Sequence, residues 1–282
     1  MNSSLLKPLQ SLRDALRISQ ALARGGATAG TRTVDFANLN SWEFSGFSQN
    51  GEDGIIEMLL QHLVTRTRSF IEIGAADAHE NNSSWRAIAH RESGLMVEGS
   101  EELAARATRI VSLHAHGVRV LNRMVFPDQA ASLLTEVYDS NVDLFSLDID
   151  SVDYWVAEAL LRAGFRPSVV VVEYNSTWGP ELAVTVPRTF GGSFRDAHPS
   201  HLYFGASLGA WKTLWGSAGY RFLGVERNGV NAFFVLPERF TETFVQNVTG
   251  LPFAENYYQR AKFRTPWQRQ YDLIKHLPTV KV

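Results

Sequence analysis

Acidic and amide side chains follow two apolar stretches of the chain, at points where buried strands are expected to end. Asp148 and Asp150 follow one stretch, and Glu173 and Asn175 follow the next. Ligands of open α/β sheets bind beyond the carboxyl ends of the strands, so we expect chemistry at this edge. Carboxylate and amide oxygens are ligands that Mg²⁺ accepts in proteins. We therefore predict that these four residues hold a metal ion, with direct binding of a substrate by Asp148 as the alternative.

A glycine turn follows an earlier apolar stretch. The segment from Phe70 to Asp77 reads F-I-E-I-G-A-A-D, and Gly74 comes directly after the expected strand. A glycine at this point allows the backbone to approach a ligand closely. The next expected strand ends at Glu98, and an acidic residue there can accept hydrogen bonds from both hydroxyls of a ribose. The pattern predicts a nucleoside at the carboxyl ends of these two strands.

The same turn argues against a dinucleotide. Ala78 and His79 stand where a pyrophosphate would need bare backbone, and the third glycine of the dinucleotide pattern is missing. A nucleoside without phosphate is therefore favoured, and S-adenosylmethionine is the common cofactor of that kind. Its cationic sulfonium and amino groups suit the acidic residues Glu72 and Asp77.

Several segments resemble the FkbM-type group of S-adenosylmethionine-dependent methyltransferases. They read F-S-Q-N-G-E-D at 47–53, F-I-E-I-G-A-A-D at 70–77, L-D-I-D-S-V-D-Y-W-V at 147–156 and V-V-E-Y-N at 171–175. The resemblance covers residues 47 to 236, with Ala78 and Ser151 where relatives usually carry glycine. It implies a methyl donor held by a set of residues around the glycine turn: Gln49, Glu52, Glu72, Gly74, Ala75, Asp77 and Glu98.

Methyl transfer to an acceptor also needs a group that removes the acceptor's proton. The candidate catalytic residues are Asp148, His198 and His201, and both histidines lie in the irregular stretch where the acceptor is expected. Aromatic residues near this stretch can form an acceptor wall or belong to the core: Tyr174, Trp178, Tyr203 and Phe204. Arg188 and Arg195 could meet a phosphate or carboxylate of the acceptor, although solvated side chains are the ordinary expectation.

The residues that could do chemistry lie at the ends of elements that alternate along the chain. Between Ser69 and Tyr174, five apolar runs are separated by helix-like stretches, which specifies parallel strands joined by right-handed crossovers. Asn228 and Gly229 lie between two further apolar runs, which indicates an antiparallel hairpin. We therefore predict an α/β fold with a doubly wound, seven-stranded, mostly parallel sheet and a C-terminal hairpin, as in Rossmann-like class I methyltransferases.

The chain is expected to have three parts. Residues 1–46 form a helical arm, 47–240 the Rossmann-like domain and 241–282 a helical tail. Leucines at helical spacing occupy the arm, and Gly25, Gly26 and Gly30 predict the end of this helix. The apolar face of the arm could pack on its own domain, on a second subunit or on a membrane surface, so a homo-oligomer is one expectation. The tail could be a lid, a subunit contact or ordinary packing.

Composition limits the partners of this protein. The 282 residues include no cysteine, so a metal site must use oxygen or imidazole ligands. A formal net charge of -2 argues against an electrostatic nucleic-acid binder. No apolar run approaches the roughly 18 residues that span a bilayer. The N-terminus also lacks the apolar core of a secretory signal, so we expect a cytoplasmic protein without a transmembrane segment.

These patterns predict an S-adenosylmethionine-dependent O-methyltransferase, assisted by Mg²⁺, that acts on a small-molecule or glycan acceptor. The resemblance alone implies a sugar hydroxyl, in a surface polysaccharide or a glycosylated natural product. Methylation of an amine, which needs no metal, is one alternative. A non-catalytic binding or assembly module that keeps the fold is the other.

Overall fold

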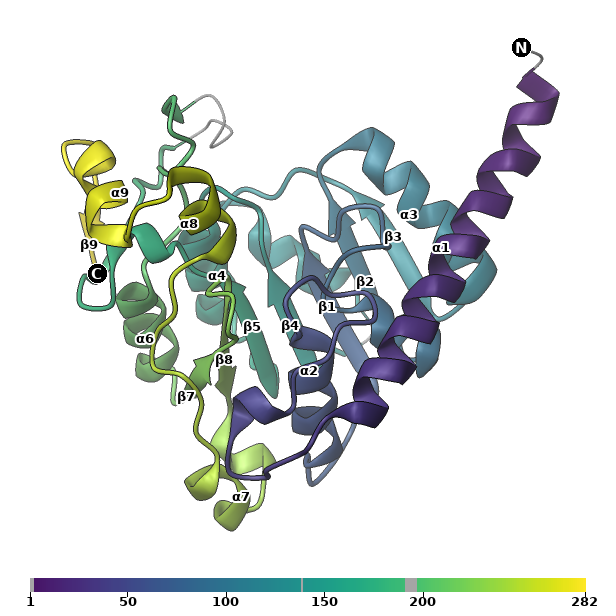
Figure 1. The fold of residues 1–282 in the computed structure, drawn as a ribbon, viewed down its shortest axis with the longest axis horizontal. Helices are drawn as coiled ribbons and strands as arrows, with labels where there is room; N and C mark the ends of the chain where they lie inside the picture. Colours follow the sequence, from purple (N-terminus) through teal and green to yellow (C-terminus); the bar gives the residue numbers. More distant parts are fainter. Residues whose placement is uncertain (1–2, 138, 191–196) are drawn as a thin grey trace.

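The computed structural model describes residues 3–137, 139–190 and 197–282, with side chains from residue 9 onward. A seven-stranded sheet of order β3-β2-β1-β4-β5-β8-β7 lies between layers of helices (Figure 1). Its strands are β1 (Ser69–Ile73), β2 (Ser93–Glu98), β3 (Val118–Asn122), β4 (Leu144–Leu147), β5 (Val169–Glu173), β7 (Arg221–Val225) and β8 (Asn231–Val235). Strands β1 to β5 pair in parallel, and β8 pairs antiparallel with β5 and β7. The predicted doubly wound α/β sheet with its closing hairpin is confirmed.

Strand β5 shows why the sequence forms this sheet. Its valines, Val169 to Val172, are all fully buried. A strand covered on both faces has no polar side, so it consists of one apolar run rather than an alternating pattern. Branching at Cβ restricts χ1 and suits the extended backbone. The sheet's centre is therefore recognisable in the sequence as uninterrupted apolar residues.

Helices cover both faces and enclose two cores. One core lies between the sheet and the helices α4 (Asp153–Arg162) and α6 (Leu208–Ser217), where Val156 and Trp211 are fully buried. The other core lies under α1 (Ser3–Thr31), α2 (Glu52–Gln61) and α3 (Glu101–His114), where Ile55 and Ile110 are fully buried. Burial of apolar surface on both faces is the main stabilising contribution to such a fold.

Strand register brings three chain segments to one edge of the sheet. Ile73 pairs with Leu147, and Leu147 pairs with Val172. The residues that follow each of these, Gly74, Asp148 and Glu173, therefore lie side by side at the carboxyl edge of the sheet.

Helix α1 does not end at the predicted glycines, because it continues through them to Thr31. Gly25 is buried, and a Cβ there would lie 2.5 Å from the ring of Trp85. Close packing against Trp85 thus explains this glycine. The expectation that Gly25 and Gly26 end the helix was wrong, whereas Gly30 lies one residue before its last residue, Thr31. The division into three parts at residues 46 and 240 stays a prediction.

Smaller elements complete the chain. The tail carries α7 (Glu242–Asn247), α8 (Tyr257–Phe263), α9 (Trp267–Ile274) and β9 (Val280–Lys281), which pairs with β6 (Val184–Thr185). Short helical turns are η1 (Leu39–Ser41), η2 (Trp85–Ala89), η3 (Ala130–Thr135), η4 (Ser176–Trp178) and η5 (Pro237–Arg239). Within the described residues, no helix has the length and apolar character needed to cross a membrane.

Candidate functional site

The turn after β1 requires glycine at position 74. Gly74 has a φ of +88°, and a Cβ there would lie 1.6 Å from the backbone oxygen of Asp148. The ends of β1 and β4 can approach this closely only because residue 74 has no side chain. Backbone rather than side chains therefore forms this part of the edge.

A cavity of about 570 Å³ lies over the ends of β1, β2 and β4. Among the predicted donor-binding residues, Gln49, Gly74 and Glu98 line it, as do Asp148 and Asp150 of the acidic pair. Part of its apolar lining comes from the segment after β3, with Met124, Val125 and Phe126. Three strand ends thus contribute to one space, which we call the first cavity.

Glu98 is held in place by backbone groups at the mouth of this cavity. Its carboxylate accepts hydrogen bonds from the N–H groups of Ala76, at 2.9 Å, and Ser100, at 2.7 Å. The two donors use one lone pair on each oxygen, so the carboxylate can still accept further hydrogen bonds. A pair of hydroxyls on a ligand would be suitable donors.

Four other predicted donor-binding residues do not line the first cavity, and two of them are carboxylates that hold loops. Glu72 is buried and accepts hydrogen bonds from the N–H groups of Asn82, at 2.9 Å, and Ser83, at 3.1 Å. Burial raises the pKa of Glu72 to about 7. Glu52 is also buried and accepts a hydrogen bond of 2.7 Å from Asn231 in β8. Both carboxylates act in the framework, and contact with a donor stays a prediction.

The other two lie beside the glycine turn. Ala75 is fully buried. Asp77 lies 3.4 Å from the ring of His79 and 3.7 Å from Arg17 of α1. Hydrogen bonding from His79 is the main cause that lowers the pKa of Asp77 to about 2, and Arg17 adds to it. His79 and Asp77 therefore connect the turn to α1, and direct contact of Ala75 and Asp77 with a donor stays a prediction.

Asp148, Asp150 and Glu173 form an acidic cluster. Each offers a carboxylate oxygen, and these three oxygens lie within 4.8 Å of one another. Burial raises the pKa of Asp148 and of Glu173 well above the ordinary range, and the neighbouring carboxylates raise it further. Such crowding favours either a shared proton or a bound cation.

One further residue, Asp153, positions the acidic cluster. Asp153 is buried in the first turn of α4 and accepts hydrogen bonds of 2.8 Å from the N–H groups of Ile149 and Ser151. These bonds fix the loop that carries Asp150, whose φ of +54° lies in the left-handed region. A non-glycine residue in this conformation is held there by its surroundings.

Asn175, predicted as a metal ligand, is engaged in holding another segment. Its amide nitrogen donates to the backbone oxygens of Leu202, at 2.7 Å, and Phe204, at 3.1 Å. Its oxygen accepts a hydrogen bond of 3.0 Å from the N–H of Thr177. These contacts attach the segment 202–204 to the end of β5, and a metal contact of Asn175 stays a prediction.

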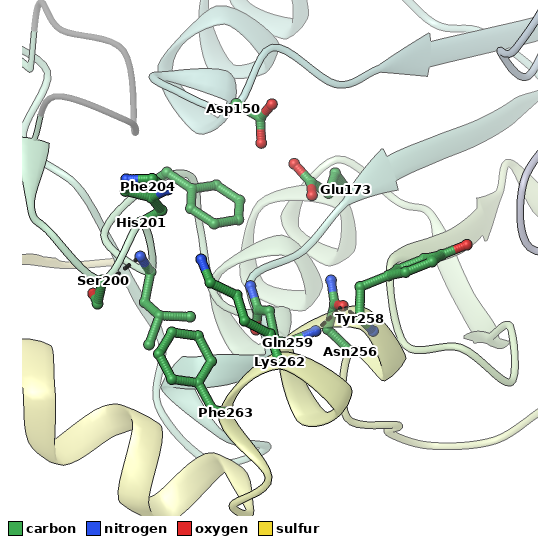
Figure 2. A pocket seen from close by; sticks show the side chains of 11 residues that line it. Asp150, Glu173, Ser200, His201, Phe204, Asn256, Tyr258, Gln259, Lys262 and Phe263 are labelled. Atoms are coloured by element: carbon green, nitrogen blue, oxygen red, sulfur yellow. Dashed lines mark hydrogen bonds between the residues drawn. The ribbon is translucent and has the colours of Figure 1, made fainter.

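A second cavity, of about 230 Å³, lies on the other side of the acidic cluster. Asp150 and Glu173 form one side of it (Figure 2). The opposite side comes largely from the tail, through Gln259, Lys262 and Phe263 in and at the end of α8. The remaining lining residues are Ser200, His201, Leu202, Phe204, Asn256 and Tyr258. Asp150 lines both cavities, so the two spaces meet at the acidic cluster.

A lid was one of the three roles expected for the tail, but no motif in the sequence marks the tail residues that line the second cavity. Two hydrogen bonds bring the tail to the site: Asn256 donates its N–H to Ser176 Oγ at 2.9 Å, and Thr177 donates its hydroxyl to Gln259 Oε1 at 3.1 Å. Asn256 also caps α8, since its side chain accepts from the N–H groups of Tyr258 and Gln259. An Asn directly before a helix, here Asn256, is a local sequence signal for the start of α8.

The predicted catalytic histidines differ in position. His201 lines the second cavity, whereas His198 does not. The Nδ1 atom of His198 lies 2.8 Å from Ser200 Oγ. Of the predicted aromatic wall, Phe204 lines the cavity. The other three are buried in the core: Tyr174, Trp178 and Tyr203. Arg188 pairs with Asp128, and Arg195 lies outside the described residues.

No family model matches the chain, and no curated protein matches it in sequence. Among solved structures, the chain is similar to the O-methyltransferase TomG from Streptomyces achromogenes in complex with SAM, at 16% identity over 75% of this chain and 94% of that chain, with a TM-score of 0.44. An O-methyltransferase from Bacillus cereus in complex with SAH has 13% identity over 77% of this chain and 88% of that chain, with a TM-score of 0.41. A SAM-dependent methyltransferase from Aquifex aeolicus has 14% identity over 64% of this chain and 87% of that chain, with a TM-score of 0.37. At these scores the likenesses assign neither a family nor an activity to the chain.

Proposed function

We propose that this chain is an S-adenosylmethionine-dependent methyltransferase that methylates a hydroxyl of a sugar-type acceptor. The observation that carries the proposal is the meeting of two cavities at the acidic cluster, with Asp150 in the lining of both. Group transfer requires two adjoining sites, because donor and acceptor must be held with their reacting atoms in contact. A module that bound a single ligand would need only one of these spaces.

The first cavity suits the donor. Its volume of about 570 Å³ lies in the range of small-ligand sites. Glu98 can accept hydrogen bonds from both ribose hydroxyls, and Val125 and Phe126 offer apolar contact for a base. Asp148 lines the same cavity, and the cationic methionine end of the donor would favour its ionised form there.

The acidic cluster suits a divalent cation. Burial raises the pKa values of Asp148 and Glu173, and repulsion among the three close carboxylates raises them further. A Mg²⁺ ion bound by Asp148, Asp150 and Glu173 would offset the repulsion and polarise a hydroxyl of the acceptor. The donor set is all oxygen, which agrees with a chain that has no cysteine.

The reaction itself is an in-line displacement. The acceptor oxygen forms a bond to the methyl carbon while the bond from that carbon to sulfur breaks, and sulfur keeps the electron pair as a neutral thioether. The hydroxyl proton passes to a base next to the acceptor. The candidates are His201, which lines the second cavity, and Asp148 of the acidic cluster, which lines the first. The chain holds the two reactants in line and receives the proton.

Calorimetry with S-adenosylmethionine and S-adenosylhomocysteine tests donor binding, with and without Mg²⁺. We expect binding of both. Glu98→Gln should weaken it, whereas the matched variant Glu101→Gln, at an exposed residue in the first turn of α3, should not. Absence of donor binding by the intact protein would refute the proposal and favour a non-catalytic module.

The acceptor and the metal need a separate measurement. Transfer of a labelled methyl group to a panel of sugar and amine acceptors, with and without a chelator, distinguishes the candidates. We expect transfer to a sugar hydroxyl that Mg²⁺ stimulates and that the double variant Asp150→Asn, Glu173→Gln loses. Transfer to amines that a chelator does not affect would favour N-methylation. Full activity in the double variant would refute the proposal that a metal ion assists the reaction.

A further inference from the structure

The N-terminal half of α1 carries an apolar stripe that nothing in the described part of the chain covers. Leu9, Leu12 and Leu16 are exposed by 60%, 68% and 58%. Their spacing of three and four residues places them on one side of the helix. We call these three residues the leucine stripe.

The direction of the leucine stripe is fixed by the other side of the helix. Ile18, Ala21 and Gly25 are buried against the body of the protein. Asp14 is buried as well, and its carboxylate accepts a hydrogen bond of 2.7 Å from Arg109 in α3. Because this opposite side is attached, the helix cannot rotate to hide the leucines, and the stripe faces outward.

The charge beside the leucine stripe is almost entirely positive. Four basic residues lie in α1, at Lys7, Arg13, Arg17 and Arg24, whereas Asp14 is its only acidic residue. Asp14 is already paired with Arg109, and Arg17, although exposed, lies 3.7 Å from Asp77. Arg13 is exposed next to the leucines. The whole chain has a formal net charge of -2, so the positive charge is a local property of this helix.

The free half of α1 extends past the carboxyl edge of the sheet. Arg17 lies 3.7 Å from Asp77, which follows β1 at this edge. From there the helix continues away from the body toward the N-terminus (Figure 1). The N-terminal half of α1 therefore extends beyond the carboxyl edge of the sheet, over which the first cavity lies.

We propose that the N-terminal half of α1 binds the surface of a bilayer that contains anionic lipids. The leucine stripe would enter the boundary between headgroups and acyl chains, and Arg13 would contact the headgroups. Pairing with α1 of a second copy fits less well, because Arg13 would find no acidic partner on the facing helix. This anchor goes beyond the proposed methyl transfer and does not depend on it.

Flotation of the full chain with phosphatidylcholine vesicles, with and without phosphatidylglycerol, tests the proposal. We expect binding only to the anionic vesicles, weakened by salt, and a loss of about fivefold in Arg13→Gln. The triple variant Leu9→Gln, Leu12→Gln, Leu16→Gln should lose binding while its thermal unfolding midpoint is unchanged, because all three leucines are exposed. Leu113→Gln on α3 is the matched control, since Leu113 is exposed by 55% outside the leucine stripe.

Several outcomes would overturn the anchor. One is absence of binding to any vesicle, and another is undiminished binding of the triple leucine variant. Sedimentation equilibrium provides a further check: a dimer that the wild type forms and the triple variant loses, without vesicle binding by either, would assign the stripe to a second copy.

Discussion

Substitution of Gly74 by alanine tests the claim that close contact between strand ends shapes the donor side of the site. The new Cβ would lie 1.6 Å from the backbone oxygen of Asp148, about half of an ordinary contact distance, so the ends of β1 and β4 must separate. The φ of +88° adds a cost of about 1–2 kcal/mol for an L-residue. The forced separation adds about 1–3 kcal/mol by analogy with overpacked cores.

Two other glycines isolate these contributions. Gly164 has nearly the same φ, +87°, but nothing lies within 4 Å of its Cβ position, so Gly164→Ala should show only the backbone cost. Gly26 lies in exposed helix with open space and no positive φ, so Gly26→Ala should stabilise the helix by about 0.5–1 kcal/mol.

Urea unfolding and calorimetry with S-adenosylhomocysteine measure both consequences. We expect Gly74→Ala to lose about 2–5 kcal/mol of unfolding free energy, the sum of the two costs. Its donor affinity should also fall, whereas Gly164→Ala, at the opposite edge of the sheet, should keep wild-type affinity. If Gly74→Ala were no less stable than Gly164→Ala and bound donor equally well, the contact with Asp148 would not matter and the reasoning would be refuted.

Three further predictions concern single side chains around the site. Glu98→Gln should weaken donor binding about tenfold, because the ligand hydroxyls lose hydrogen bonds to a charged acceptor, and such bonds contribute about 1.5–3 kcal/mol. An unchanged affinity in calorimetry would contradict the role of Glu98. Asn175→Ala should raise the KM for the acceptor and leave the donor Kd unchanged, because it frees the segment 202–204 from β5; equal effects on both ligands would contradict this division. Asp77 has a pKa lowered to about 2 by His79 and Arg17, so its stabilising contribution is present above the ordinary value of 3.8 and disappears as the pH falls toward 2. Asp77→Asn should therefore lose about 1–2 kcal/mol in urea unfolding at neutral pH and almost nothing near pH 2, and an equal loss at both would show that the charge is irrelevant.

The sheet could be predicted because the residues that specify each strand and turn are close together in the sequence. Val169 to Val172 are recognisable as a doubly buried strand, and Asn228 and Gly229 as a turn between two strands. The end of α1 could not be predicted in this way. Gly25 is small because Trp85 packs on it, and that contact joins residues that are far apart in the sequence.

Within the candidate site, strand ends were predictable and side-chain directions were less so. Gly74, Glu98 and Asp148 follow or end strands, and all three line the first cavity. Glu72 was included with them, but successive side chains in a strand point to opposite faces. Ile73 lines the cavity, so Glu72 points to the other face, where it holds Asn82 and Ser83. The alternation of strand residues could have separated these two positions.

The residues around the second cavity are positioned by the end of one strand, β5, rather than by a sequence motif. Asn175 binds the segment 202–204, and Thr177, two residues later, binds Gln259 of α8. Glu173, two residues earlier, belongs to the acidic cluster. The end of β5 thus positions three walls of the second cavity, whereas the first cavity is built on β1, β2 and β4. The two cavities are thus positioned by different strands. Substitutions in the segment 200–204 and in α8 can therefore change which acceptor the second cavity binds without moving Gly74 and Glu98 in the first cavity.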